Sequence, residues 1–184
     1  CDAHLMITPE QRVKLYRQWE KMIEKRKYMI ADFWNSGTIS HGCIAYGRER
    51  RGYLYINWDG NIMPCVFVPY YVDNVKDLIK QRKPISDALR SKFFVNGRKW
   101  QKEYEKPNGN GSSDPDNWIM CCSIRDHYKN FKKNILTADA KSENQTAEDA
   151  RNSKSYEEMM DNFDKKLSTL TDPIWEKEYK VKAE

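Results

Sequence analysis

Long apolar runs are absent from this sequence of 184 residues. None of its apolar stretches approaches the roughly 18–20 residues that a helix needs to cross a bilayer, which argues against a membrane-spanning protein. The first residues, CDAHLMITPEQR, lack the basic segment and apolar stretch of a secretory signal peptide. No segment repeats along the chain, which excludes a repeat architecture. We therefore expect a soluble, cytoplasmic protein without a membrane partner.

A strong charge of one sign is also absent. The chain has 32 Lys and Arg residues against 27 Asp and Glu residues, and its net charge is +5 at pH 7. Proteins that bind nucleic acid usually gather their basic residues on one face, whereas this small excess is scattered. Nucleic acid is therefore not expected as a partner.

Large aromatic side chains are plentiful. Six Trp, eleven Tyr and six Phe residues supply much of the surface that a core can bury, although hydrophobic residues make up only 39% of the chain. The length fits one ordinary domain, or a small domain with an appendage.

The first half of the chain has clear secondary-structure signals. Thr8, Pro9 and Gln11 form a capping box with proline at the first helical position, so they predict a helix that ends near Lys27. The apolar residues that follow, Tyr28–Trp34, predict a short buried strand.

A hairpin is expected next. Gly52–Trp58 and Asn61–Val68 are rich in β-forming residues, and Asp59-Gly60 between them is a favoured two-residue turn. Pro64 interrupts strand pairing, so Cys65 is expected at an edge or a bulge.

The second half is more polar. Ser86–Glu103 predicts a helix that Gly97 breaks or kinks, and Lys106–Asp116 reads as a loop. Thr137–Asn152 is expected to be mobile because it has almost nothing to bury. A last helix is expected from Tyr156 to Leu170, with Asp172-Pro173 as its end. Together these elements predict an α+β fold.

Five cysteines carry the functional signal. An odd number of cysteines without a secretory signal favours metal ligation or free thiols over a disulfide framework. Cys43 and Cys65 flank the hairpin, which brings them back toward one point, and Cys121 and Cys122 follow a long connection. Thiolates that converge from separate segments are the ligands of iron–sulfur clusters. Neighbouring side chains tend to point apart, which leaves open whether Cys121 and Cys122 both bind.

The spacing of these residues resembles a known family. Cys43, sixteen residues, Gly60, four residues and Cys65 resemble the C-x(9–15)-G-x(4)-C signature of SPASM and twitch domains, with a first gap one residue longer. The segment GYLYINWDGNIMPCVF looks like the family's strand, turn, strand and Pro-Cys. The later C-x(2)-C-x(5)-C-x(3)-C series of a full SPASM domain is absent, so the smaller twitch type, with one cluster, fits better.

The resemblance implies an auxiliary [4Fe–4S] cluster in a radical S-adenosylmethionine enzyme. Cys43, Cys65, Cys121 and Cys122 would bind the cluster, for electron transfer or substrate binding in the radical modification of a peptide or small molecule. The chain lacks the C-x(3)-C-x(2)-C motif that holds the cluster cleaving S-adenosylmethionine, so it is not expected to be active alone. It looks like the C-terminal part of a longer enzyme, whose N-terminal barrel would bind S-adenosylmethionine and would be its partner, with a reductant protein as a further one.

Three domains follow from this resemblance. Residues 1–40 look like the tail of a radical S-adenosylmethionine barrel, 41–135 like a twitch or SPASM-like cluster-binding domain, and 136–184 like a polar linker with an amphipathic helix. The alternative is a non-enzymatic zinc module, in which Cys43, Cys65, Cys121 and either Cys122 or His41 form a tetrahedral site. The absence of C-x(2–4)-C pairs, the usual spacing of such sites, argues against zinc.

Overall fold

The computed structural model describes residues 5–49, 52–104 and 117–180. The predicted α+β class is confirmed, since helices dominate and the strands form two small antiparallel sheets. None of the described helices has the length and apolar character of a membrane span. Cys1 and the predicted loop Lys106–Asp116 lie outside the described residues. In chain order the elements are α1 (Pro9–Glu24), α2 (Gly37–Ser40), β1 (Tyr55–Ile56), β2 (Asn61–Met63), β3 (Tyr70–Tyr71), β4 (Asp73–Asn74), α3 (Val75–Lys80), the 3-10 helix η2 (Ile85–Arg90), α4 (Lys92–Tyr104), the 3-10 helix η3 (Trp118–Met120), α5 (Tyr128–Asn130), the π-helix η4 (Phe131–Ile135), β5 (Lys141–Ser142), α6 (Gln145–Asn152), α7 (Lys154–Trp175) and the π-helix η5 (Glu176–Lys180).

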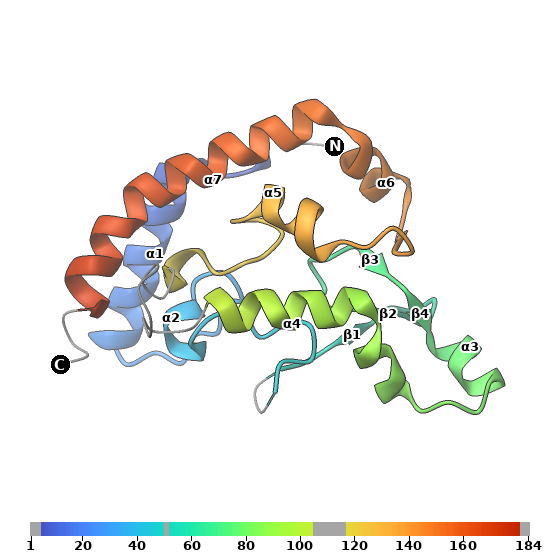
Figure 1. Cartoon of the computed structure of the whole chain (residues 1–184). Helices are drawn as coiled ribbons and strands as arrows, with labels where there is room; N and C mark the ends of the chain where they lie inside the picture. The colour runs from blue at the N-terminus through green and yellow to red at the C-terminus, as the bar shows by residue number, and fades with distance from the viewer. Residues whose placement is uncertain (1–4, 50–51, 105–116, 181–184) are drawn as a thin grey trace.

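Helix α1 begins as predicted. The Thr8 hydroxyl accepts from the backbone N–H of Gln11, and the Gln11 side chain accepts from that of Thr8. The helix ends at Glu24, close to the expected Lys27. Helices α1 and α7 lie side by side at one end of the molecule, while α3 and the three-stranded sheet lie at the other (Figure 1).

The predicted strand Tyr28–Trp34 is wrong. This segment has no regular structure before a turn at Phe33, and Met29 is fully exposed. The apolar run lacks a neighbouring strand to pair with, and two of its aromatic rings instead contact rings from other segments, with the ring centroids of Trp34 and Phe67 4.8 Å apart. The helix and strand expected at a barrel end are thus not both present in the described part of the chain.

The hairpin is confirmed, with a longer turn. Tyr55 pairs with Met63 and Ile56 with Ile62, and the Asn57 N–H donates to the Asn61 carbonyl. The loop therefore has three residues, Trp58–Gly60, and Gly60 takes the positive φ of 88° that favours glycine. Strand β2 ends at Met63, short of the predicted Val68, so Cys65 lies beyond the strand and not at an edge or a bulge within it.

The later elements differ from the predictions in three places. Helix α4 starts only at Lys92, after η2. It runs unbroken through Gly97, where the ring of Tyr46 occupies the space that a side chain would need. Thr137–Asn152 is folded: β5 pairs with β3, and α6 buries Ala147.

Pro173 does not end α7, which continues to Trp175. Thr171 and Trp175 extend the buried stripe of Leu167, and Asn117 donates to both Thr171 and Asp172. This burial and these bonds offset the cost of proline inside a helix.

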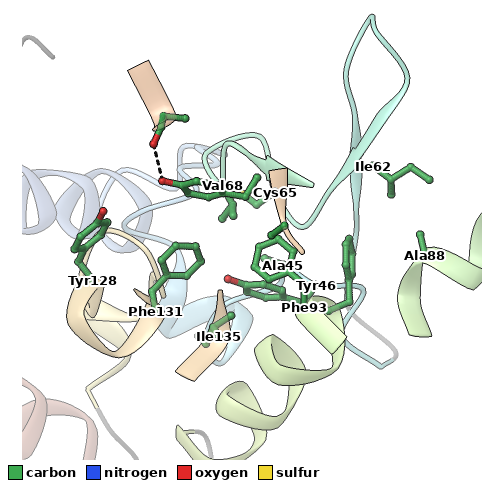
Figure 2. Close-up of a cluster of buried hydrophobic side chains, with 14 of the residues drawn as sticks. Ala45, Tyr46, Ile62, Cys65, Val68, Ala88, Phe93, Tyr128, Phe131 and Ile135 are labelled. Carbon is green, nitrogen blue, oxygen red and sulfur yellow. Dashed lines mark hydrogen bonds between the residues drawn. The ribbon is translucent and has the colours of Figure 1, made fainter. Parts of the chain in front are cut away.

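The main core lies between the hairpin, α4 and the segment 128–135. Figure 2 shows Cys65 and Val68 at this core, with the rings of Tyr46, Phe93 and Phe131 among the buried side chains. The Tyr46 ring meets Phe93 edge-on at 6.1 Å, a favoured geometry for aromatic pairs. Two smaller clusters pack where α1 and α7 meet η3.

Candidate iron–sulfur site

The four described cysteines line one cavity of about 150 Å³. Cys43 comes from the segment after α2, Cys65 from the segment after the hairpin, and Cys121 and Cys122 from the turn after η3. None of the four forms a disulfide within the described part of the chain. The remaining wall is mostly apolar and includes Ala31, Phe33, Trp34, Ile44, Ala45, Tyr53 and Phe67.

The loop of Cys43 is held against the segment of Cys65. The Tyr46 N–H donates to the Pro64 carbonyl at 3.1 Å, which joins the two segments. Buried Gln101 donates to the carbonyls of Cys43 and Ala45, both at 3.0 Å. Cys43 is thus positioned by α4 as well as by the hairpin.

Cys121 and Cys122 are placed by the two residues before them. Ile119 packs in the cluster of Tyr16, Trp19 and Trp175, whereas Met120 packs with Phe163 and Leu167. The chain then turns at Cys121, whose φ of −99° and ψ of 0° are not those of a strand. Because the alternation of side chains belongs to strands, both neighbouring cysteines can reach the same cavity.

Helix α2 approaches Cys121 closely at Gly37. A Cβ added at Gly37 would lie 2.2 Å from the Trp118 carbonyl oxygen and 2.5 Å from the Cys121 Sγ. Only glycine fits between α2 and the cysteine turn, so Gly37 determines how far Cys121 extends toward the cavity.

The hydroxyl of Tyr53 contacts the sulfur of Cys65. Tyr53 Oη lies 2.7 Å from Cys65 Sγ. A tyrosine hydroxyl next to a thiolate donates its hydrogen, so this contact favours the charged form of Cys65. Burial first, and then the Cys65 contact, raise the pKa of Tyr53, which keeps this donor protonated.

Burial dominates the electrostatics of the cysteines. It raises the pKa of Cys65 and raises those of Cys121 and Cys122 well above the usual value. The charges of Asp126 and Cys43 raise the pKa of Cys121 and of Cys122 further, whereas the charge of Arg12 lowers the pKa of Cys121. These thiols are therefore protonated at neutral pH, and it takes a bound cation to deprotonate them.

The donor set and the space fit an iron–sulfur cluster. Four sulfurs in a mostly apolar cavity suit soft iron ions. The volume corresponds to roughly five water molecules at about 30 Å³ each. A single zinc ion would set a stricter requirement on the same residues. Two thiolates bound to one zinc ion lie within about 4.6 Å of each other, since each Zn–S bond is about 2.3 Å. Among the described residues, no three His, Cys, Asp or Glu side chains are arranged to hold one metal ion.

His41 does not reach this cavity. Its ring stacks on Trp118 at 5.0 Å, and its backbone has a positive φ of 54°. The guanidinium of Arg125 lies over the Trp34 ring at 4.1 Å, and Trp34 forms part of the cavity wall.

Three buried polar residues near the site were not predicted as functional: Arg12, Gln101 and Asp126. Arg12 precedes Tyr16 by four positions and Trp19 by seven, so the helical spacing alone places it on the buried face of α1. Asp126 follows Cys122 by four residues, and nothing in the sequence indicates that its side chain folds back onto the Cys122 backbone.

A Gly37→Ala variant is expected to lose most of its iron-binding capacity. The added methyl group has to displace Trp118 or Cys121, and such overpacking costs about 1–3 kcal/mol of folding stability. Iron content after anaerobic reconstitution measures the effect. Leu78→Ala is the control, because it removes a buried side chain in α3, far from α2 in Figure 1, and destabilises the fold while leaving the cavity intact. Full iron content in Gly37→Ala would show that the position of Cys121 is unimportant.

Comparison with protein families identifies part of the chain. Residues 43–110 match the family described as SPASM, an iron-sulfur cluster-binding domain. The matched segment includes Cys43, Gly60 and Cys65, as the sequence signature predicts, and ends before Cys121. No curated protein and no solved structure matches the chain.

Proposed function

We propose that this chain, which carries a SPASM/twitch-type iron–sulfur cluster-binding domain at residues 43–110, binds one [4Fe–4S] cluster through Cys43, Cys65, Cys121 and Cys122. The carrying observation is that cysteines from three separate segments line a single apolar cavity. Four cysteine thiolates are the common ligand set of a [4Fe–4S] cluster. Cys121 and Cys122 thus complete the set that the matched segment begins.

Electron transfer is the role that this ligand set favours. When bound, the cluster supplies one-electron redox chemistry. Four protein sulfurs would cap all of its irons, which leaves no open position for a substrate. The apolar wall, including Phe33, Trp34 and Phe67, keeps water away from the sulfurs. Gln101 and Gly37 hold the ligand loops at the cavity, and Tyr53 donates to Cys65.

The enzyme that this cluster would serve is a radical S-adenosylmethionine enzyme that modifies a peptide or a small molecule. A barrel with its own cluster would bind S-adenosylmethionine, and a reductant protein would supply electrons. The domain family supports this context, because the cluster-binding match is to SPASM. The chain's own cysteines support only the auxiliary role, because none of them form a C-x(3)-C-x(2)-C motif.

Anaerobic reconstitution tests the cluster. The wild-type chain is expected to become brown and to hold about four irons. Each of the variants Cys43→Ala, Cys65→Ala, Cys121→Ala and Cys122→Ala is expected to lose the cluster or hold it incompletely, whereas the control Cys1→Ala keeps it. A colourless wild-type chain that retains one zinc ion would overturn the proposal in favour of a structural zinc module.

A second measurement tests the role. The electron paramagnetic resonance spectrum of the reduced cluster is expected to stay unchanged when S-adenosylmethionine is added, because every iron is already capped by a sulfur. A changed spectrum, or formation of 5′-deoxyadenosine by the chain alone, would show an open iron and contradict an electron-transfer role.

A further inference from the structure

A buried ion pair joins the first helix to the cysteine turn. Arg12 on α1 is 2% exposed and Asp126 is fully buried, although 114 residues separate them in the sequence. Arg12 Nη1 and Nη2 donate to the two oxygens of the same carboxylate. Such a bidentate pair fixes orientation as well as distance.

The same guanidinium also bonds two backbone carbonyls, one in the cavity wall and one just before the cysteine turn. Arg12 Nη2 donates to the Ile119 carbonyl at 3.1 Å, two residues before Cys121, and to the Trp34 carbonyl at 3.2 Å. On the other side of the pair, Asp126 Oδ2 accepts from the backbone N–H of Cys122 at 3.0 Å. Arg12 therefore contacts the turn before the cysteines directly and the turn after them through Asp126.

A second cation shares this carboxylate. Arg125 Nε donates to Asp126 Oδ1 at 3.1 Å, and its side chain is only 13% exposed. Its Nη2 is buried and has no hydrogen-bond partner among the described residues. Two guanidinium groups and one carboxylate leave one net positive charge, buried behind Trp34 and the cysteine turn.

We propose that Arg12 is a positioning residue that fixes the Cys121–Cys122 turn, and that Arg12 and Arg125 together exceed the charge of Asp126 and raise the reduction potential of the bound cluster. This inference rests on the proposed function, since it presupposes a cluster in the cavity. Reduction adds a negative charge, which a nearby buried cation stabilises and a nearby carboxylate disfavours. The effect is strong here because buried charges are poorly screened by water and salt.

The reduction potential of the reconstituted chain separates charge from structure. Arg12→Gln is expected to lower the midpoint potential and Asp126→Asn to raise it, each by about a tenfold change in the equilibrium for reduction, which is about 59 mV for one electron. Damage to the fold would not produce shifts of opposite sign. Arg17→Gln is the control, because Arg17 lies on the same helix but pairs with Glu20 and Glu178 at the surface, and no shift is expected.

Arg12→Lys tests positioning. Lysine keeps the charge but lacks the fork that contacts Asp126, Ile119 and Trp34 at once. We expect the equilibrium constant for reduction to stay within a few-fold of the wild-type value. We also expect the variant to lose iron to a chelator about tenfold faster, because residues that support metal ligands typically contribute at least about tenfold to metal affinity. Retention of iron at the wild-type rate in Arg12→Lys would contradict the positioning role.

The failures of the two proposals are distinguishable. A wild-type chain that takes up no iron refutes the proposed function. If the wild-type chain binds a cluster, but Arg12→Gln and Asp126→Asn have the same reduction potential as the wild type, only the inference about charge is refuted. If Arg12→Gln does not fold, Arg125→Gln gives the same test, because Arg125 makes fewer contacts, and its potential is expected to fall as well.

Discussion

Replacing Arg12 with alanine is expected to lower the free energy of unfolding of the cluster-free protein by about 3–5 kcal/mol. The change leaves Asp126 fully buried with one of its two cationic partners removed, and it frees the carbonyls of Ile119 and Trp34. Of its bonds to cations, Asp126 then keeps only the single bond to Arg125, and breaking a bidentate buried pair while freeing two carbonyls is among the most destabilising changes that a single substitution produces. Chemical denaturation followed by circular dichroism measures the loss.

The matched control lies further along the same helix, α1. Arg17 pairs with Glu20 and Glu178, and its side chain is 36% exposed, so Arg17→Ala is expected to cost at most about 1 kcal/mol. The double variant Arg12→Ala with Asp126→Ala tests the mechanism. If the cost comes from the carboxylate left behind, the double variant is more stable than the sum of the two single losses predicts. Equal losses in Arg12→Ala and Arg17→Ala would contradict a special role for the buried pair.

Local sequence signals predicted the elements whose determinants are local. The capping box at Thr8 and Gln11 places the start of α1, and Gly60 places the turn of the hairpin. Each of these features depends on backbone preferences of one or two residues. The same hairpin carries the signature that the family comparison confirms.

Contacts between distant segments explain the failures. Tyr28–Trp34 has the composition of a strand but no partner strand, so its apolar side chains remain partly exposed beside the cavity. Thr137–Asn152 looks too polar to fold, yet its few apolar residues, Ala140 and Ala147, reach the main core because β5 pairs with β3. Neither outcome is visible in a window of neighbouring residues.

The candidate site shows the same division. The four cysteines could be named from the sequence, because residue type and spacing carry that information. The residues that position these cysteines could not be named from the sequence, since Arg12 bonds to Asp126 across 114 residues and Gln101 bonds to Cys43 across 58. A polar side chain on a buried helical face, such as Arg12, is the one sequence signal that such a network leaves.

Removal of the cluster is expected to loosen the cavity wall at residues 31–42 while the rest of the fold persists. This segment contains only the four-residue helix α2, and its amides depend on local bonds such as Ser36 N–H to Asp32 and Gly42 N–H to Gly37. Without a cluster, buried thiols of raised pKa remain protonated and no longer draw Cys43 toward Cys121 and Cys122. The segment therefore loses the interaction that connects its loops.

Hydrogen exchange on cluster-free and reconstituted samples measures this difference. Amides of Ser36 and Gly42 are expected to exchange at least about tenfold faster without the cluster, which corresponds to about 1.4 kcal/mol of local stability, whereas the amide of Tyr46 stays protected by its bond to the Pro64 carbonyl. Amides inside α4 and α7 serve as controls and are expected to be unchanged. The turn at Cys121 is expected to stay protected too, because Asn117 is bonded to α7, and Arg12 and Tyr104 bond the carbonyls of Ile119 and Met120. Equal protection of residues 31–42 in both samples would mean that the cavity is preformed, and would favour buried structural cysteines over cluster ligands.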